Sequence, residues 1–104
     1  CSVLKERLGA QSVALPFGSA KIRTLGVVSG GAADMMPQAA EAGLDLYITG
    51  EANEPLQEAC RESGINCVCA GHYNSEKPGV LALADLVRRR FRIEARFIDV
   101  PNPA

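Results

Sequence analysis

A single histidine and a carboxylate four residues after it are the side chains of this sequence best suited to bind a metal ion. The stretch from Gly71 to Glu76 holds the only histidine of the chain. If a helix begins near Ser75, a spacing of four places His72 and Glu76 on one face, about a turn apart. One metal ion can then contact both side chains. The alternative is a hydrogen-bonded histidine on an ordinary helix, where such pairs are common.

Three predicted strands end in turns that are polar or rich in glycine. Residues 23–28, 44–49 and 65–70 are short apolar runs with β-branched members, a pattern typical of buried strands. The turns that follow them are Ser29-Gly30-Gly31, Gly50-Glu51 and Gly71-His72. In open α/β sheets, ligands bind at the carboxyl edge of the strands. We therefore expect these turns to converge on one candidate site.

The first two turns each allow a chemical and a structural interpretation. Backbone N–H groups at Ser29, Gly30 and Gly31 can face an anion, which makes these residues candidates for substrate binding. Glycine is also the usual residue in any tight strand-to-helix turn. The sequence contains neither a GxGxxG nor a GxxxxGK(S/T) pattern, the two glycine-rich motifs that bind nucleotides. Glu51 is either a catalytic carboxylate or a helix-start residue favoured by the helix dipole.

The order of elements predicts an α/β fold. Alternating strands and helices imply right-handed crossovers and a mostly parallel or mixed sheet with helices on both faces. Pro16 indicates that the first strand lies at an edge or ends there. The 104 residues are expected to form a single domain. The predicted helices are residues 2–8, 32–42, 54–63 and 80–90, and the predicted strands are 12–16, 23–28, 44–49, 65–70 and 92–100.

Composition excludes several classes of partner. The net charge of −1 with mixed signs does not indicate nucleic acid or an anionic membrane. The cluster Arg88-Arg89-Arg90, with Arg92, complements the end of a helix or contacts an acidic partner. No apolar run is long enough to span a membrane.

The four cysteines have neither a CxxC nor a zinc-ribbon spacing. We predict that they are reduced, in a cytoplasmic compartment. Because the chain opens with Cys1 rather than methionine, a preceding segment is expected to have been removed.

Together these motifs resemble the NIF-three-like family, known as type 2 GTP cyclohydrolase I or dinuclear metal centre proteins. The resemblance implies two similar α/β repeats around a two-metal site, with this chain as the C-terminal repeat of a longer protein. The residues that carry it are Val28-Ser29-Gly30-Gly31-Ala32, Tyr47-Ile48-Thr49-Gly50-Glu51, Ala70-Gly71-His72 with Glu76, and Phe97 to Pro103.

The resemblance also implies a function. His72 and Glu76 would be ligands of two divalent metal ions (Zn, Fe, Mn or Mg), and Glu51 would support a ligand or act as general base. The parent protein would hydrolyse a nucleotide or another phosphate-containing substrate. Tyr73 stands where relatives can carry a second histidine, and we do not assign it as a ligand.

The family's other ligands belong to the first repeat, so this chain alone is expected to bind metal weakly or not at all and to be inactive. The alternative is a non-catalytic regulatory or scaffold module with structural metals in a ring-like homo-oligomer. Expected partners are the missing N-terminal repeat and further copies of the chain. Self-association is predicted, with the edge of a closing strand around Phe97 and Ile98 as one surface for it.

Overall fold

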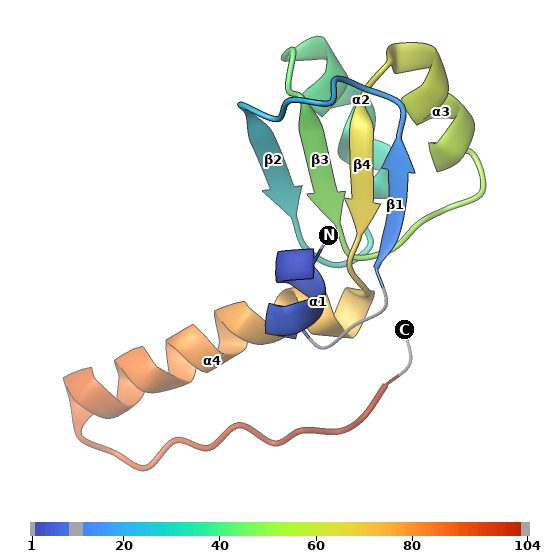
Figure 1. Ribbon diagram of the computed structural model, residues 1–104. Helices are drawn as coiled ribbons and strands as arrows, with labels where there is room; N and C mark the ends of the chain where they lie inside the picture. The colour runs from blue at the N-terminus through green and yellow to red at the C-terminus, as the bar shows by residue number, and fades with distance from the viewer. Residues whose placement is uncertain (1, 9–11, 103–104) are drawn as a thin grey trace.

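The computed structural model describes residues 2–8 and 12–102, and the sheet within them is mixed, as predicted. Its strands lie in the order β1-β4-β3-β2, with β2, β3 and β4 parallel and β1 antiparallel at the edge (Figure 1). The elements are α1 (Ser2–Leu8), β1 (Val13–Pro16), β2 (Leu25–Val28), the 3₁₀ helix η1 (Ala33–Met35), α2 (Met36–Glu41), β3 (Leu46–Thr49), α3 (Leu56–Ser63), β4 (Asn66–Cys69) and α4 (His72–Phe91).

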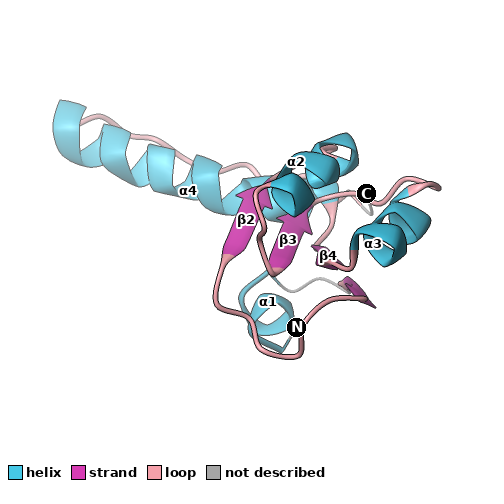
Figure 2. Ribbon diagram, turned by 90° about the horizontal axis from the view of Figure 1, so that it is seen from above, coloured by secondary structure: helices cyan, strands magenta, loops and turns pink. Residues whose placement is uncertain are grey.

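The helices are distributed about the sheet as an α/β fold requires. Helices α2 and α3 lie on one side of the sheet, and α1 lies on the other, beyond the carboxyl ends of β2, β3 and β4 (Figure 2). Both α2 and α3 end at a glycine in the left-handed region, Gly43 with φ 73° and Gly64 with φ 64°. These glycines confirm the helix ends predicted from the sequence.

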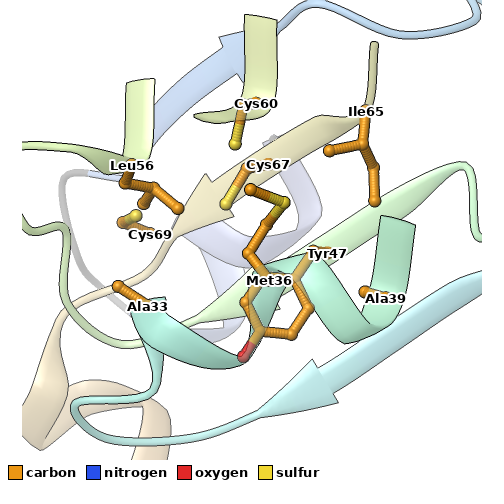
Figure 3. Close-up of a cluster of buried hydrophobic side chains, with 9 residues drawn as sticks. All are labelled: Ala33, Met36, Ala39, Tyr47, Leu56, Cys60, Ile65, Cys67 and Cys69. Carbon is orange, nitrogen blue, oxygen red and sulfur yellow. The ribbon is translucent and has the colours of Figure 1, made fainter. Parts of the chain in front are cut away.

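The core lies between the sheet and the helices α2 and α3. Tyr47 on β3 is only 2% exposed, and its hydroxyl donates a hydrogen bond of 2.6 Å to the carbonyl of Ala32. This bond satisfies the one polar atom that the ring carries into the core. The buried cluster consists of Ala33, Met36, Ala39, Tyr47, Leu56, Cys60, Ile65, Cys67 and Cys69 (Figure 3).

Three cysteines of this core are free thiols. Cys67 and Cys69 lie two apart on β4, face the core together, and meet Cys60 of α3 (Figure 3). Burial raises the pKa of the Cys60 thiol, and a hydrogen bond with Cys69 together with burial raises that of Cys67. Cys1 lies outside the described residues.

Helix α4 is longer than predicted. It begins at His72 rather than at residue 80 and runs for 20 residues with Pro78 inside it. Its first turn lies below the sheet, and the rest extends away from the body of the molecule (Figure 1). None of its side chains that the structure describes is buried. Within the described residues, no helix is apolar and long enough to cross a membrane.

The prediction of a closing strand over residues 92–100 is wrong. The chain reverses at Arg92, whose φ is 49°, and then runs back beside α4 without forming a strand (Figure 1). The Arg88 side chain donates a hydrogen bond of 2.7 Å from Nε to the carbonyl of Ala95. The segment with alternating apolar residues therefore lies beside helix α4 and not beside a strand.

The carboxylate of Asp45 joins the starts of β2 and β3. Its Oδ2 accepts hydrogen bonds from the backbone N–H groups of Arg23, at 2.9 Å, and Thr24, at 3.0 Å. These bonds, with the Thr24 hydroxyl and the Arg23 charge, lower the pKa of Asp45 below its ordinary value of 3.8. The ionised carboxylate is therefore the form that stabilises the fold.

We predict that Asp45→Asn reduces stability at neutral pH. Because the pKa of Asp45 is lower in the folded state, its contribution is complete above the unfolded value and is lost as the pH falls through the folded value. The difference between the two proteins in urea unfolding should therefore shrink below about pH 4. A difference that stays constant from pH 7 to pH 3 would contradict the assignment.

The exposed apolar side chains of α4 predict self-association of this chain. Val80, Leu83 and Leu86 are 52%, 58% and 49% exposed, more than a monomer usually leaves uncovered on one helix. Sedimentation should show concentration-dependent association that Leu83→Glu weakens. Ala82→Glu, which adds the same charge on the side of Asp85 and Arg89, is the control. A monomer at high concentration would refute the prediction.

Candidate metal centre

The turns after β2, β3 and β4 meet at the carboxyl edge of the sheet, as the sequence predicted. The carbonyl of Gly30 accepts hydrogen bonds from the backbone N–H groups of Gly50, at 3.0 Å, and Glu51, at 3.1 Å. The Gly71 N–H donates to the carbonyl of Gly50 at 2.8 Å. Backbone hydrogen bonds alone therefore join the three turns.

Ser75 fastens the first turn of α4 to this junction. Its hydroxyl donates to the carbonyl of His72 at 2.9 Å and accepts from the N–H of Gly30 at 3.1 Å. The Ser75 N–H donates to the carbonyl of Gly71 at 2.9 Å, which closes the first helical turn. His72 therefore lies on the first turn of a helix rather than in the loop that the sequence indicated.

Gly30 leaves the space that the functional side chains occupy. Its φ is 71°, in the left-handed region. A Cβ atom there would lie 2.6 Å from Oε1 of Glu76 and 3.3 Å from Nε2 of His72. A Cβ on Gly31 would lie 3.3 Å from Oε2 of Glu51. Because the two glycines have no side chain, the backbone can lie close to the His72 ring and to the carboxylates of Glu76 and Glu51.

The imidazole of His72 lies between two carboxylates. Its Nδ1 is 2.9 Å from Oε1 of Glu51, and its Nε2 is 3.3 Å from Oε1 of Glu76. The hydrogen bond to Glu51 raises the pKa of His72 above its ordinary value, and the charges of both carboxylates act in the same direction. The three side chains are 39% to 51% exposed, so an ion in solution can reach them.

This arrangement fits a metal ligand and its supporting partner. A carboxylate can only accept a hydrogen bond, so Glu51 selects the tautomer with the proton on Nδ1 and leaves Nε2 free to bind a metal. Two ligands about 2.1 Å from one ion are about 3.0 to 3.5 Å apart, and Nε2 and the Glu76 carboxylate meet this spacing. Within the described part of the chain, no group of three or more His, Cys, Asp and Glu side chains is arranged to hold a metal ion.

The structure brings five of the six predicted site residues close together. They are Gly30, Gly31, Glu51, His72 and Glu76. The sixth, Ser29, is exposed in the turn after β2.

Sequence reasoning missed two residues near the site, Ser75 and Asn102. Asn102 lines a hollow of about 260 Å³ with His72, Tyr73 and Glu76. Ser75 follows His72 by three residues, and this spacing could have placed it beside His72 on a helix. The position of Asn102 depends instead on the path of the chain after α4.

Comparison with known proteins establishes the family. The model of the Duf34/NIF3 (NGG1p interacting factor 3) family matches residues 1–103. The chain belongs to the Duf34/NIF3 family. This confirms the resemblance that the sequence motifs indicated.

Curated Duf34/NIF3 relatives are longer than this chain. A GTP cyclohydrolase 1 type 2 homolog of Pseudomonas aeruginosa is 42% identical over 101 residues, which cover 97% of this chain and 40% of the relative. A protein of the same name from Archaeoglobus fulgidus is 42% identical over 99 residues, or 95% of this chain and 40% of the relative. The chain therefore spans about 40% of the length of these relatives.

Solved structures show the same fold. The structural-genomics protein ybgI, of unknown function, has a TM-score of 0.94 at 32% identity over 99% of this chain and 42% of that protein. The protein TTHA1606 of Thermus thermophilus has a TM-score of 0.91 at 31% identity over 99% of this chain and 41% of that protein. The arm formed by α4 and the following segment lies within this matched range.

A pair of glycine substitutions separates strain from site disruption. Gly43 has φ 73° and open space around it, so Gly43→Ala should lower stability by about 1–2 kcal/mol, the cost of the left-handed conformation alone. Gly30→Ala has the same left-handed strain, and its methyl group also displaces the Glu76 carboxylate, the end of a flexible and half-exposed side chain. This displacement should lower the pKa of His72, which Glu76 raises, whereas Gly43→Ala should leave that pKa unchanged. Chemical unfolding measures the stability of both variants and NMR titration measures the pKa of His72. The same pKa in both variants would show that the close approach at Gly30 does not matter.

Proposed function

We propose that this chain is the C-terminal half of a dinuclear metal-binding, hydrolase-like protein and supplies His72 and Glu76 as metal ligands. The supporting observation is the imidazole between two carboxylates at the carboxyl edge of the sheet, with Nδ1 bound to Glu51 and Nε2 beside Glu76. Because the chain spans about 40% of its relatives, the preceding part of the protein would supply the remaining ligands.

The chain's own residues would have distinct tasks in such a centre. Glu51 orients the imidazole through Nδ1 and is also the candidate general base, since its second carboxylate oxygen faces Gly31. The Ser29-Gly30-Gly31 turn lies at the same edge and would contact the substrate through Ser29 and Gly31, because the Gly30 N–H already donates to Ser75. Divalent ions at such a centre would supply the Lewis acidity for hydrolysis of a nucleotide or another phosphate-containing substrate.

The first test is metal affinity by calorimetric titration of Zn²⁺ or Mn²⁺ into the longer protein. His72→Ala and Glu76→Ala should each abolish the binding of one metal ion or lower its affinity by more than about 100-fold, because each variant removes a direct ligand. Glu51→Gln should weaken binding by about 10- to 100-fold, the usual effect of losing the partner of a ligating histidine.

Glu54→Ala is the control for this titration, since it removes an exposed glutamate three residues from Glu51 and should leave metal affinity unchanged. Wild-type metal content in His72→Ala and Glu76→Ala would refute the assignment. The 104-residue chain, titrated in parallel, should hold little or no metal on its own.

A second function is favoured by the exposed apolar arm. Phe91 at the end of α4 is 65% exposed, and Ile98 in the segment beside it is 80% exposed. Such a surface suits a regulatory or scaffold module whose metals are structural and whose active form is a homo-oligomer. Turnover of nucleotides and phosphoesters with added divalent metal separates the two functions. Turnover abolished by His72→Ala supports the enzyme, and its absence across the panel supports the module.

A further inference from the structure

Polar contacts hold the first turn of α4 in place. None of the α4 side chains that the structure describes is buried, so the helix contributes no side chain to the core. Pro78 has no backbone N–H, so the helix lacks the bond that would join residue 78 to the carbonyl of Asn74. Tyr73 and Lys77 bind Asp99, which joins the turn to the returning segment rather than to the sheet. The place of this turn against the sheet therefore depends on its hydrogen bonds to the turns after the strands.

Ser75 provides one of these bonds through a side chain that is not itself a proposed ligand. Its hydroxyl accepts the Gly30 N–H at 3.1 Å and donates to the carbonyl of His72 at 2.9 Å. A Cβ atom on Gly50 would come within 2.7 Å of the same hydroxyl. The Ser75 hydroxyl thus lies against the turns after β2 and β3 at once.

The two proposed ligands lie on either side of Ser75 in the sequence. Ser75 follows His72 by three residues and directly precedes Glu76. A shift of this turn away from Gly30 would therefore move both ligands together. It would also lengthen the 2.9 Å contact between Nδ1 of His72 and Oε1 of Glu51. Ligands bind a metal ion tightly when supporting contacts hold them in one geometry.

We infer that Ser75 is a positioning residue of the candidate metal centre. Its hydroxyl fixes the first turn of α4 against the Gly30 turn and so sets the place of both proposed ligands. Ser75 does not contact the ion in this role, because its hydroxyl is engaged by Gly30 and His72. The inference rests on the proposed function, since it concerns the ligands of a metal ion.

Amide exchange tests the hydrogen bond in the metal-free longer protein. Ser75→Ala removes the acceptor of the Gly30 N–H, so this amide should exchange with deuterium about fivefold faster, the usual effect of one lost hydrogen bond. Alanine is a better helix former than serine, so a weaker helix cannot account for the change. Ser75→Thr should keep the wild-type rate, because a threonine hydroxyl in a helix can bond the same carbonyl.

Zn²⁺ titration by calorimetry into the same proteins tests the positioning. Ser75→Ala should lower the Zn²⁺ affinity about tenfold, the smaller effect expected for a contact that supports a ligand. Ser75→Thr should bind Zn²⁺ as the wild type does. Gly43→Ala is the matched control, since its left-handed strain lowers stability on another helix and should leave the Zn²⁺ affinity unchanged.

Each other outcome has a distinct meaning. Wild-type Zn²⁺ affinity or an unchanged Gly30 exchange rate in Ser75→Ala would overturn the inference and leave the metal centre intact. An equal loss of affinity in Ser75→Thr would show that the hydroxyl is not responsible, and an equal loss in Gly43→Ala would assign the effect to stability. Either result would also overturn it. A wild-type protein that binds no Zn²⁺ would refute the proposed function and this inference with it.

Discussion

The site depends on the backbone of one residue, Gly30. Its carbonyl accepts the N–H groups of Gly50 and Glu51, and its own N–H donates to Ser75 on the first turn of α4. These bonds bring three turns from distant parts of the sequence to one point. A side chain at this position would occupy the space of the Glu76 carboxylate. Glycine is thus required for the conformation and for the close approach, and the imidazole environment follows from both.

The sheet and the His72–Glu76 pair were predictable because their signals are local. Apolar runs bounded by glycine mark the strands, and a spacing of four holds wherever a helix forms. The start of α4 was not predictable, because Pro78-Gly79 resembles a helix start whereas the bond between Ser75 and Gly30 decides where the helix begins. The alternation after Arg92 resembles a strand, but a strand needs a neighbour that the local sequence does not encode. The position of Asn102 beside His72 and Glu76 likewise depends on the path of the chain after Arg92, which the local sequence does not encode.

Helix α4 joins the candidate metal centre to an exposed apolar surface. Its first turn carries His72 and Glu76 against the sheet, and its remaining turns expose apolar side chains. Pro78 lies between these two parts and removes one backbone hydrogen bond of the helix. The first turn is held by its own bonds to the Gly30 turn, so the geometry of the imidazole does not depend on the exposed turns alone.

The thiols of Cys60, Cys67 and Cys69 affect how different metals act on folding. In the native state they are enclosed in the core, where burial keeps the thiols of Cys60 and Cys67 protonated. Unfolding exposes them together, and thiolates bind zinc far more strongly than they bind manganese or magnesium. Zinc would thus have ligands in the unfolded chain as well as at the proposed centre, whereas manganese would favour the proposed centre. The two ions should then move the folding equilibrium by different amounts even where their affinities for the proposed centre are equal.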